Sequence, residues 1–154
     1  MNKRLLCGVA VMAAFGLVLG GCGKKPDKNK EGQATVTFGN TKVQAKDENS
    51  TAAIPLPPNM PAYAAVYPGG NVMAVVTMSD EETGTMISYS TKAKPEDVIA
   101  FYKKNAKAAS LESLHEMQIA GAWTFAAQSK DSEKTVTVTI MANEGEQQVQ
   151  EVYR

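Results

Sequence analysis

The sequence predicts an α+β fold, a two-layer sandwich in which one amphipathic helix covers an antiparallel meander sheet. Six segments after residue 54 are rich in β-branched residues or alternate between apolar and polar side chains, as strands do. One segment between the second and third of them has helical periodicity instead. Because most consecutive strands are joined by short turns, the order β-β-α-β-β-β-β favours a sheet with its helix on one face.

The first two strands are predicted as a hairpin. Residues 72–78 are apolar and β-branched, 79–84 form a polar turn, and 85–91 alternate. Tyr67 to Gly70, with the sequence Tyr-Pro-Gly-Gly, is typical of a turn that leads into the hairpin. The proline-rich stretch 54–61 before it should be extended and stiff.

The helix is predicted to begin at Pro95. Proline fits the first helical position, and the carboxylates of Glu96 and Asp97 favour the positive end of the helix dipole. One stripe of the helix is largely apolar, and lysines occupy the wet side. The stripe comprises Val98, Ile99, Phe101, Tyr102, Asn105, Ala106 and Ala109.

Four strands are predicted after the helix. Residues 111–114 either extend the helix or form a loop before a strand at 115–119. Strands follow at 122–127 and 135–140, and 148–153 is expected to be an edge strand. In residues 135–140 the valines and Ile140 should point inward and the threonines outward. The expected apolar cluster is Phe101, Tyr102, Trp123, Phe125 and Val138.

The first 22 residues have the marks of an export signal. Lys3 and Arg4 precede an apolar run from Leu5 to Leu19, which is shorter than the roughly 20 residues that a membrane-spanning helix needs. The run ends in Leu19-Gly20-Gly21-Cys22, and cleavage before Cys22 is the interpretation we adopt.

These last four residues resemble the lipobox of bacterial lipoproteins. The resemblance implies that residues 1–21 are removed and that Cys22 carries a diacylglyceryl group and an acyl chain, so that the membrane is a partner of the mature protein. Gly23 instead of Asp implies the outer membrane, with the domain facing the periplasm. The alternative is an ordinary secreted protein with a free cysteine. Tyr67-Pro68-Gly69 and Phe101-Tyr102-Lys103 are also similar to motifs of small extracytoplasmic domains behind such signals.

The mature chain is expected to divide into a tether, residues 22–53, and the α+β domain, residues 54–154. The tether is polar, with six lysines and four acidic residues after Cys22. In its middle, residues 35–38 and 42–45 flank a Gly39-Asn40-Thr41 turn, which indicates a hairpin of transient strand character. The domain is mildly acidic, which argues against nucleic acid as a partner.

Candidate chemistry is sparse. Once Cys7 is removed and Cys22 acylated, no thiol remains for disulfides or metal ligation. His115, the single histidine, stands near Ser110 and Ser113, but neither serine has the surroundings of a nucleophile. We therefore expect a non-catalytic binding or structural module without cofactor, with an envelope protein as its unidentified partner.

Two alternatives remain open. His115 and Met117 would share a strand face and, with other methionines, could ligate Cu(I). The second alternative is a hydrolase with an unrecognised site. The paired carboxylates Asp80, Glu81 and Glu82 favour a solvated turn over glycosidase chemistry.

Overall fold

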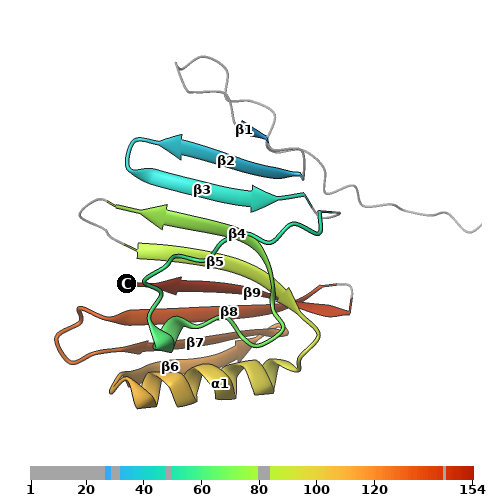
Figure 1. Cartoon of the computed structure of the whole chain (residues 1–154). Helices are drawn as coiled ribbons and strands as arrows, with labels where there is room; N and C mark the ends of the chain where they lie inside the picture. Colours follow the sequence, from blue (N-terminus) through green and yellow to red (C-terminus); the bar gives the residue numbers. More distant parts are fainter. Residues whose placement is uncertain (1–26, 29–31, 48–49, 80–83, 144) are drawn as a thin grey trace, which may run out of the picture.

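The computed structural model describes residues 27–28, 32–47, 50–79, 84–143 and 145–154, and it contains one antiparallel sheet with a single α-helix (Figure 1). The predicted fold class is confirmed. The strands are β1 (Asp27–Lys28), β2 (Gln33–Phe38), β3 (Thr41–Lys46), β4 (Asn71–Met78), β5 (Gly84–Thr91), β6 (Glu112–Ile119), β7 (Ala122–Gln128), β8 (Thr135–Asn143) and β9 (Glu146–Tyr153). The helices are the 3-10 turn η1 (Ala62–Ala64) and α1 (Pro95–Ala108).

The sheet has the order β1-β2-β3-β4-β5-β9-β8-β7-β6, which places β9 in its interior. The expectation that residues 148–153 form an edge strand is wrong, since β9 pairs with β5 on one side and with β8 on the other. The reason is topological. The connection through α1 carries the chain from β5 to the far edge, and the meander β6 to β9 then returns strand by strand until β9 meets β5 (Figure 1).

Residues 33–46, expected as part of a tether with transient strand character, form β2 and β3 in the sheet. Val36 pairs with Val43, which in turn pairs with Val76 of β4. A lone two-stranded hairpin is marginal in water, but pairing with a third strand stabilises it. The sequence signal for the hairpin was local, whereas the stabilising edge of β4 lies about thirty residues further on.

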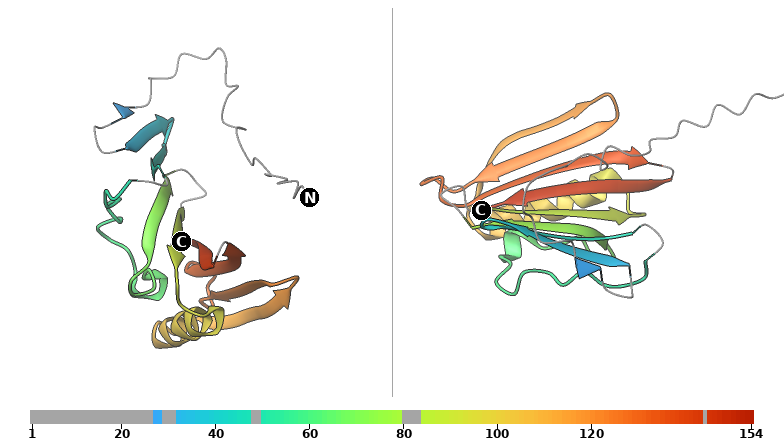
Figure 2. Two further views of the ribbon diagram at one scale, coloured as in Figure 1. Left: turned by 90° about the vertical axis from the view of Figure 1, so that its right-hand side faces the viewer. Right: turned by 90° about the horizontal axis from the view of Figure 1, so that it is seen from above.

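The helix and the proline-rich segment lie on the same side of the sheet (Figure 2). As predicted, α1 begins at Pro95 with Glu96 and Asp97 in its first turn. Residues 111–114 do not extend the helix, because it ends at Ala108 and β6 begins at Glu112. We call the side that carries α1 the covered face and the other side the open face.

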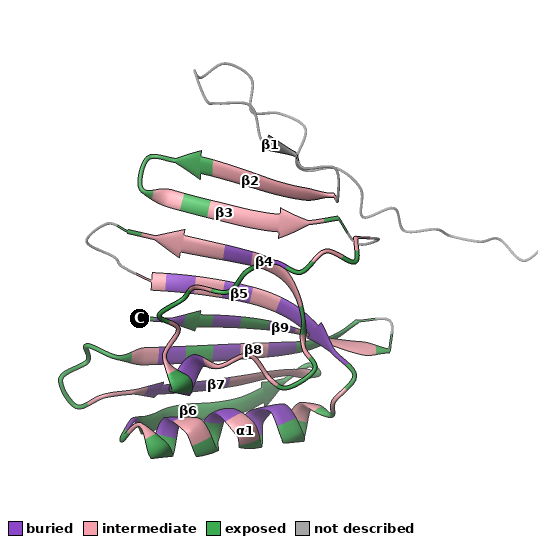
Figure 3. Cartoon of the chain, in the orientation of Figure 1, coloured by how far each residue is buried: buried purple, intermediate pink, exposed green. Residues whose placement is uncertain are grey.

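The buried core lies between the covered face, α1 and the proline-rich segment (Figure 3). The alternation in β8 is as expected, with Val136, Val138 and Ile140 fully buried. The predicted cluster needs one correction: Phe125, Val138 and Tyr102 are buried, but Phe101 and Trp123 are only partly buried at the margin of the core. Trp123 lies beside the edge strand β6, whose residues are all exposed and cover it incompletely, whereas the Phe101 ring packs on Tyr67, outside the sheet.

A fragment of residues 54–154 should unfold cooperatively. The buried hydrophobic residues of the described chain all lie between Ile54 and Tyr153, so removal of residues 23–53 exposes the edge of β4 without opening the core. We expect a single, less stable transition in urea monitored by circular dichroism. A broad, non-cooperative loss of signal would instead make β2 and β3 part of the folding unit.

Candidate functional site

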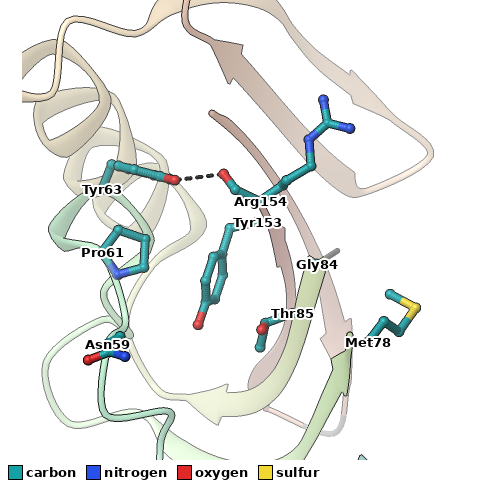
Figure 4. Close-up of a pocket in the computed structure, with 8 residues that line it drawn as sticks. All are labelled: Asn59, Pro61, Tyr63, Met78, Gly84, Thr85, Tyr153 and Arg154. Carbon is teal, nitrogen blue, oxygen red and sulfur yellow. Dashed lines mark hydrogen bonds between the residues drawn. The ribbon is translucent and has the colours of Figure 1, made fainter. Parts of the chain in front are cut away.

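A pocket opens where the proline-rich segment meets the ends of β5 and β9 (Figure 4). Its volume is about 390 Å³, within the range of small-molecule sites. It is lined by Asn59, Pro61, Tyr63, Met78, Gly84, Thr85, Tyr153 and Arg154.

Hydrogen bonding and strand register position the pocket walls. The Tyr63 hydroxyl, on η1, donates to the Arg154 carbonyl oxygen at 2.6 Å and so ties the proline-rich segment to the end of β9. Thr85 of β5 and Tyr153 of β9 are register partners, and both are buried. The pocket is therefore built from two rigid strands and a segment stiffened by prolines.

The polar groups that face the pocket are neutral. Figure 4 shows the Tyr153 hydroxyl pointing toward the space between Asn59 and Thr85, whereas the Arg154 side chain is turned away. The Arg154 guanidinium donates instead to the Ser132 carbonyl oxygen at 2.7 Å. Burial raises the pKa of the Tyr153 hydroxyl, so it stays protonated at neutral pH. The pocket offers hydroxyl and amide groups beside the apolar surfaces of Pro61 and Met78.

A buried carboxylate lies one row further along the covered face. Glu151 of β9 pairs with Ile87 and Val138 and is 0% exposed. Its Oε2 accepts a hydrogen bond from the Tyr102 hydroxyl at 2.9 Å, and that hydroxyl lies 3.0 Å from the Tyr89 hydroxyl. Its Oε1 has no hydrogen-bond partner among the described residues. A buried carboxyl oxygen left unpaired is expensive when charged.

The surroundings of Glu151 favour its neutral form. Burial raises the pKa of the carboxyl from its ordinary value to about 8, although the hydrogen bond from Tyr102 acts in the opposite direction. Burial also raises the pKa of Tyr102 and of Tyr89. At neutral pH the side chains of Tyr89, Tyr102 and Glu151 are therefore mainly protonated. They are held in place by β5, α1 and β9, respectively.

The candidates from the sequence lie away from this cluster. His115 and Met117 share a face of β6, as expected, and both are exposed. A β-bulge separates Ser113 from His115, and Ser110 lies in the turn after α1. Within the described residues no group of three or more His, Cys, Asp or Glu side chains gathers in metal-binding geometry. The carboxylates at 80–82, and Cys22 with the apolar run, fall outside the described residues.

Sequence reasoning missed Glu151, although a signal was present. Glu151 has the same strand parity as Val149 and Tyr153, so alternation places its side chain on their face. The signal was hidden by the assumption that residues 148–153 formed an edge strand. A glutamate on an edge strand can reach water, whereas on the covered face of an interior strand it is buried.

The model of the START domain-like family matches residues 71–150, which run from the start of β4 into β9. This stretch contains α1, all of β4 to β8, and β9 as far as Gln150. No curated protein and no solved structure matches the chain. In the described residues no helix has the length and apolar character required to cross a membrane.

Proposed function

The chain belongs to the START domain-like family, and from this premise we propose that its domain is a ligand-binding module without catalytic activity. Domains of this family are typically ligand-binding modules. The proposal is supported by the pocket beside Tyr153, which the fold forms from rigid elements. It presents no charged side chain to the cavity, and its lining combines hydroxyl and amide groups with the apolar surfaces of Pro61 and Met78.

The ligand class follows from this lining. Tyr153, Thr85 and Asn59 offer hydroxyl and amide groups, which suit a neutral head group with oxygen atoms. Pro61 and Met78 suit a short apolar body. We therefore propose a small, uncharged amphipathic molecule as ligand. A cavity of this size encloses about one drug-sized molecule.

Titration with monodecanoylglycerol, an uncharged amphiphile, tests this proposal. We expect chemical-shift changes in the amide resonances of Thr85 and Tyr153, and at least a tenfold loss of affinity in Asn59→Trp, because the indole blocks the pocket mouth. Leu56→Trp, in the same exposed segment but outside the pocket lining, is the matched control. Equal binding by both variants, or shift changes confined to another surface, would refute the assignment of this pocket.

We further propose that the protein acts at the cell envelope, anchored through Cys22 to the outer membrane and facing the periplasm. The support is the lipobox-like sequence Leu19-Gly20-Gly21-Cys22 at the end of the apolar run. Two or more acyl chains hold a protein at a membrane stably, at ~0.8 kcal/mol per buried methylene. An anchored module of this kind would present its pocket close to the lipid surface.

Cys22→Ala should abolish incorporation of a fatty-acid analogue and release the protein from the membrane fraction. The sulfur of Cys22 is the atom that would carry the diacylglyceryl group. The measurement is metabolic labelling followed by fractionation, with Cys7→Ala as the matched control, because Cys7 lies inside the signal. A Cys22→Ala protein that stays labelled and membrane-bound would contradict the anchor.

A further inference from the structure

From β2 to β5 the open face of the sheet is largely apolar where a solvated face would be polar, whereas on β9 and β8 it is mostly glutamine and threonine. An antiparallel sheet with one face in water normally alternates apolar residues inward with polar residues outward. Here the register aligns five apolar side chains, one from each of five neighbouring strands, into a single row on the face opposite α1. We call Val36, Val43, Val76, Met86 and Val152 the apolar row.

Residues beside the row extend its character. On β2 to β5 the open-face positions on one side of the row are small, namely Ala34, Ala45, Ala74 and Ser88. On β9 the same position is Gln150, whose side-chain amide donates to the Met86 sulfur at 2.7 Å. On the other side of the row lies the ring of Phe38, which is 60% exposed, and Val152 in the row is 39% exposed. The small neighbours leave the valines of β2 to β4 accessible to a broad partner surface.

Charge is nearly absent from the open face. From β2 across to β7, its outward positions carry one charged residue, Glu146 at the start of β9. Charged residues on these strands point to the covered side instead, as Lys42 and Glu151 do by register. No described helix or strand lies against the open face (Figure 2). Exposed apolar patches of this size mark interaction sites.

We propose that the open face is a self-association surface on which a second copy of this chain packs sheet against sheet. Two-fold symmetry brings the same patch of each copy together, so an apolar row that itself carries no charge meets its partner without like-charge repulsion. Sheets pack in this way with their strands aligned to within about 30°. The apolar row of one copy would then lie across that of the other.

The available area is sufficient for a dimer. Strands lie ~4.8 Å apart and rise ~3.3 Å per residue, so β2 to β5 with β9 present on the order of 500 Å² of sheet surface. With side-chain relief and β8 included, this approaches the ~800 Å² per partner that a standard stable interface buries.

Two other occupants fit the observations less well. A membrane surface attracts amphipathic faces that carry lysine or arginine, and the open face carries neither from β2 to β7. A small ligand needs a concave site, and the cavity beside Tyr153 is lined mainly by the proline-rich segment and the covered face. Met78 and Gly84 line that pocket from the margin of the open face, but no residue of the apolar row lines it, so the self-association surface does not depend on the ligand of the pocket.

Sedimentation velocity of the full mature chain with Cys22→Ser, which prevents acylation, tests the proposal. We expect a monomer–dimer equilibrium between about 1 and 300 µM. Val76→Lys in the centre of the apolar row should weaken the dimer at least a hundredfold, because each copy would bury an unpaired charge. Ala100→Lys, at an exposed position of α1, is the matched control and should leave the equilibrium unchanged.

A second variant distinguishes a weakened dimer from a misfolded protein. Val152 is more exposed in the monomer than the rest of the row, so Val152→Lys should keep the melting temperature of the parent while it also weakens the dimer. A monomer at every concentration would overturn the proposal. So would a dimer that both variants leave intact while they remain folded, or a monomer whose open face instead binds phosphatidylcholine vesicles in a Val76-dependent manner.

Discussion

Glu151→Gln should abolish a fall in stability that the unaltered protein shows between about pH 4.5 and 8. In the folded state burial raises the pKa of the Glu151 carboxyl to about 8, whereas the unfolded carboxyl titrates near 4.5. Between these values the folded protein holds a proton that the unfolded chain has released. The free energy of unfolding therefore falls as the pH rises through this window, and it levels off above the folded pKa.

The expected size of this fall is large for a domain of about a hundred residues. Each pH unit contributes about 1.4 kcal/mol, so the full window amounts to on the order of 4 kcal/mol. In Glu151→Gln the side chain stays neutral, and the free energy of unfolding from urea titrations should change little over the same range. Asp131 titrates outside this window, because hydrogen bonds from Ser129 and Glu133 lower its pKa.

The matched control is Glu116→Gln. Glu116 lies in the same cross-strand row as Glu151 but is exposed and pairs with Lys103 at 2.6 Å, so its substitution should leave the pH-dependent fall in place. Tyr102→Phe removes the donor to Oε2 and should move the end of the fall to higher pH. An unaltered protein of constant stability from pH 5 to 8 would show that Glu151 is solvated in solution.

The elements that could be predicted from the sequence are those with local signals. Pro95 with two acidic residues sets the start of α1, and the alternation at 135–140 sets the inward face of β8. The order of strands in the sheet had no local signal in the sequence. The pairing of β9 with β5 joins segments about sixty residues apart, and no turn links them.

The same contrast between local and non-local signals applies to the candidate site. Tyr63, Thr85 and Tyr153 come from three separate parts of the chain. The pairing of β5 with β9 brings the last two together, and the hydrogen bond from Tyr63 to the Arg154 carbonyl oxygen adds the first. Glu151 was hidden for this reason as well, since its burial depends on strands on both sides. The partial exposure of Trp123 likewise depends on the bare edge of β6, and that of Phe101 on its packing against Tyr67 outside the sheet; no local residue pattern reports either.

Phe125→Ala should lower the free energy of unfolding by ~3 to 5 kcal/mol, the range for removal of a buried phenylalanine ring. Phe125 is 1% exposed and lies in the cross-strand row with Glu116 and Val138. Ladder hydrogen bonds hold β6 and β8 on either side, so the neighbouring strands cannot close fully on the cavity.

Two further variants serve as comparisons for this prediction. The free energy of unfolding of each is measured by urea titration at constant pH. Phe101→Ala should have a smaller effect, because the Phe101 ring is only partly buried and contacts Tyr67 and Tyr102 edge-on at the margin of the core. Met117→Leu should change stability by less than about 1.5 kcal/mol, since the volume is conserved at a position that is 44% exposed. A larger loss in Phe101→Ala than in Phe125→Ala would mean that the helix, and not the centre of the sheet, carries the packing of the covered face.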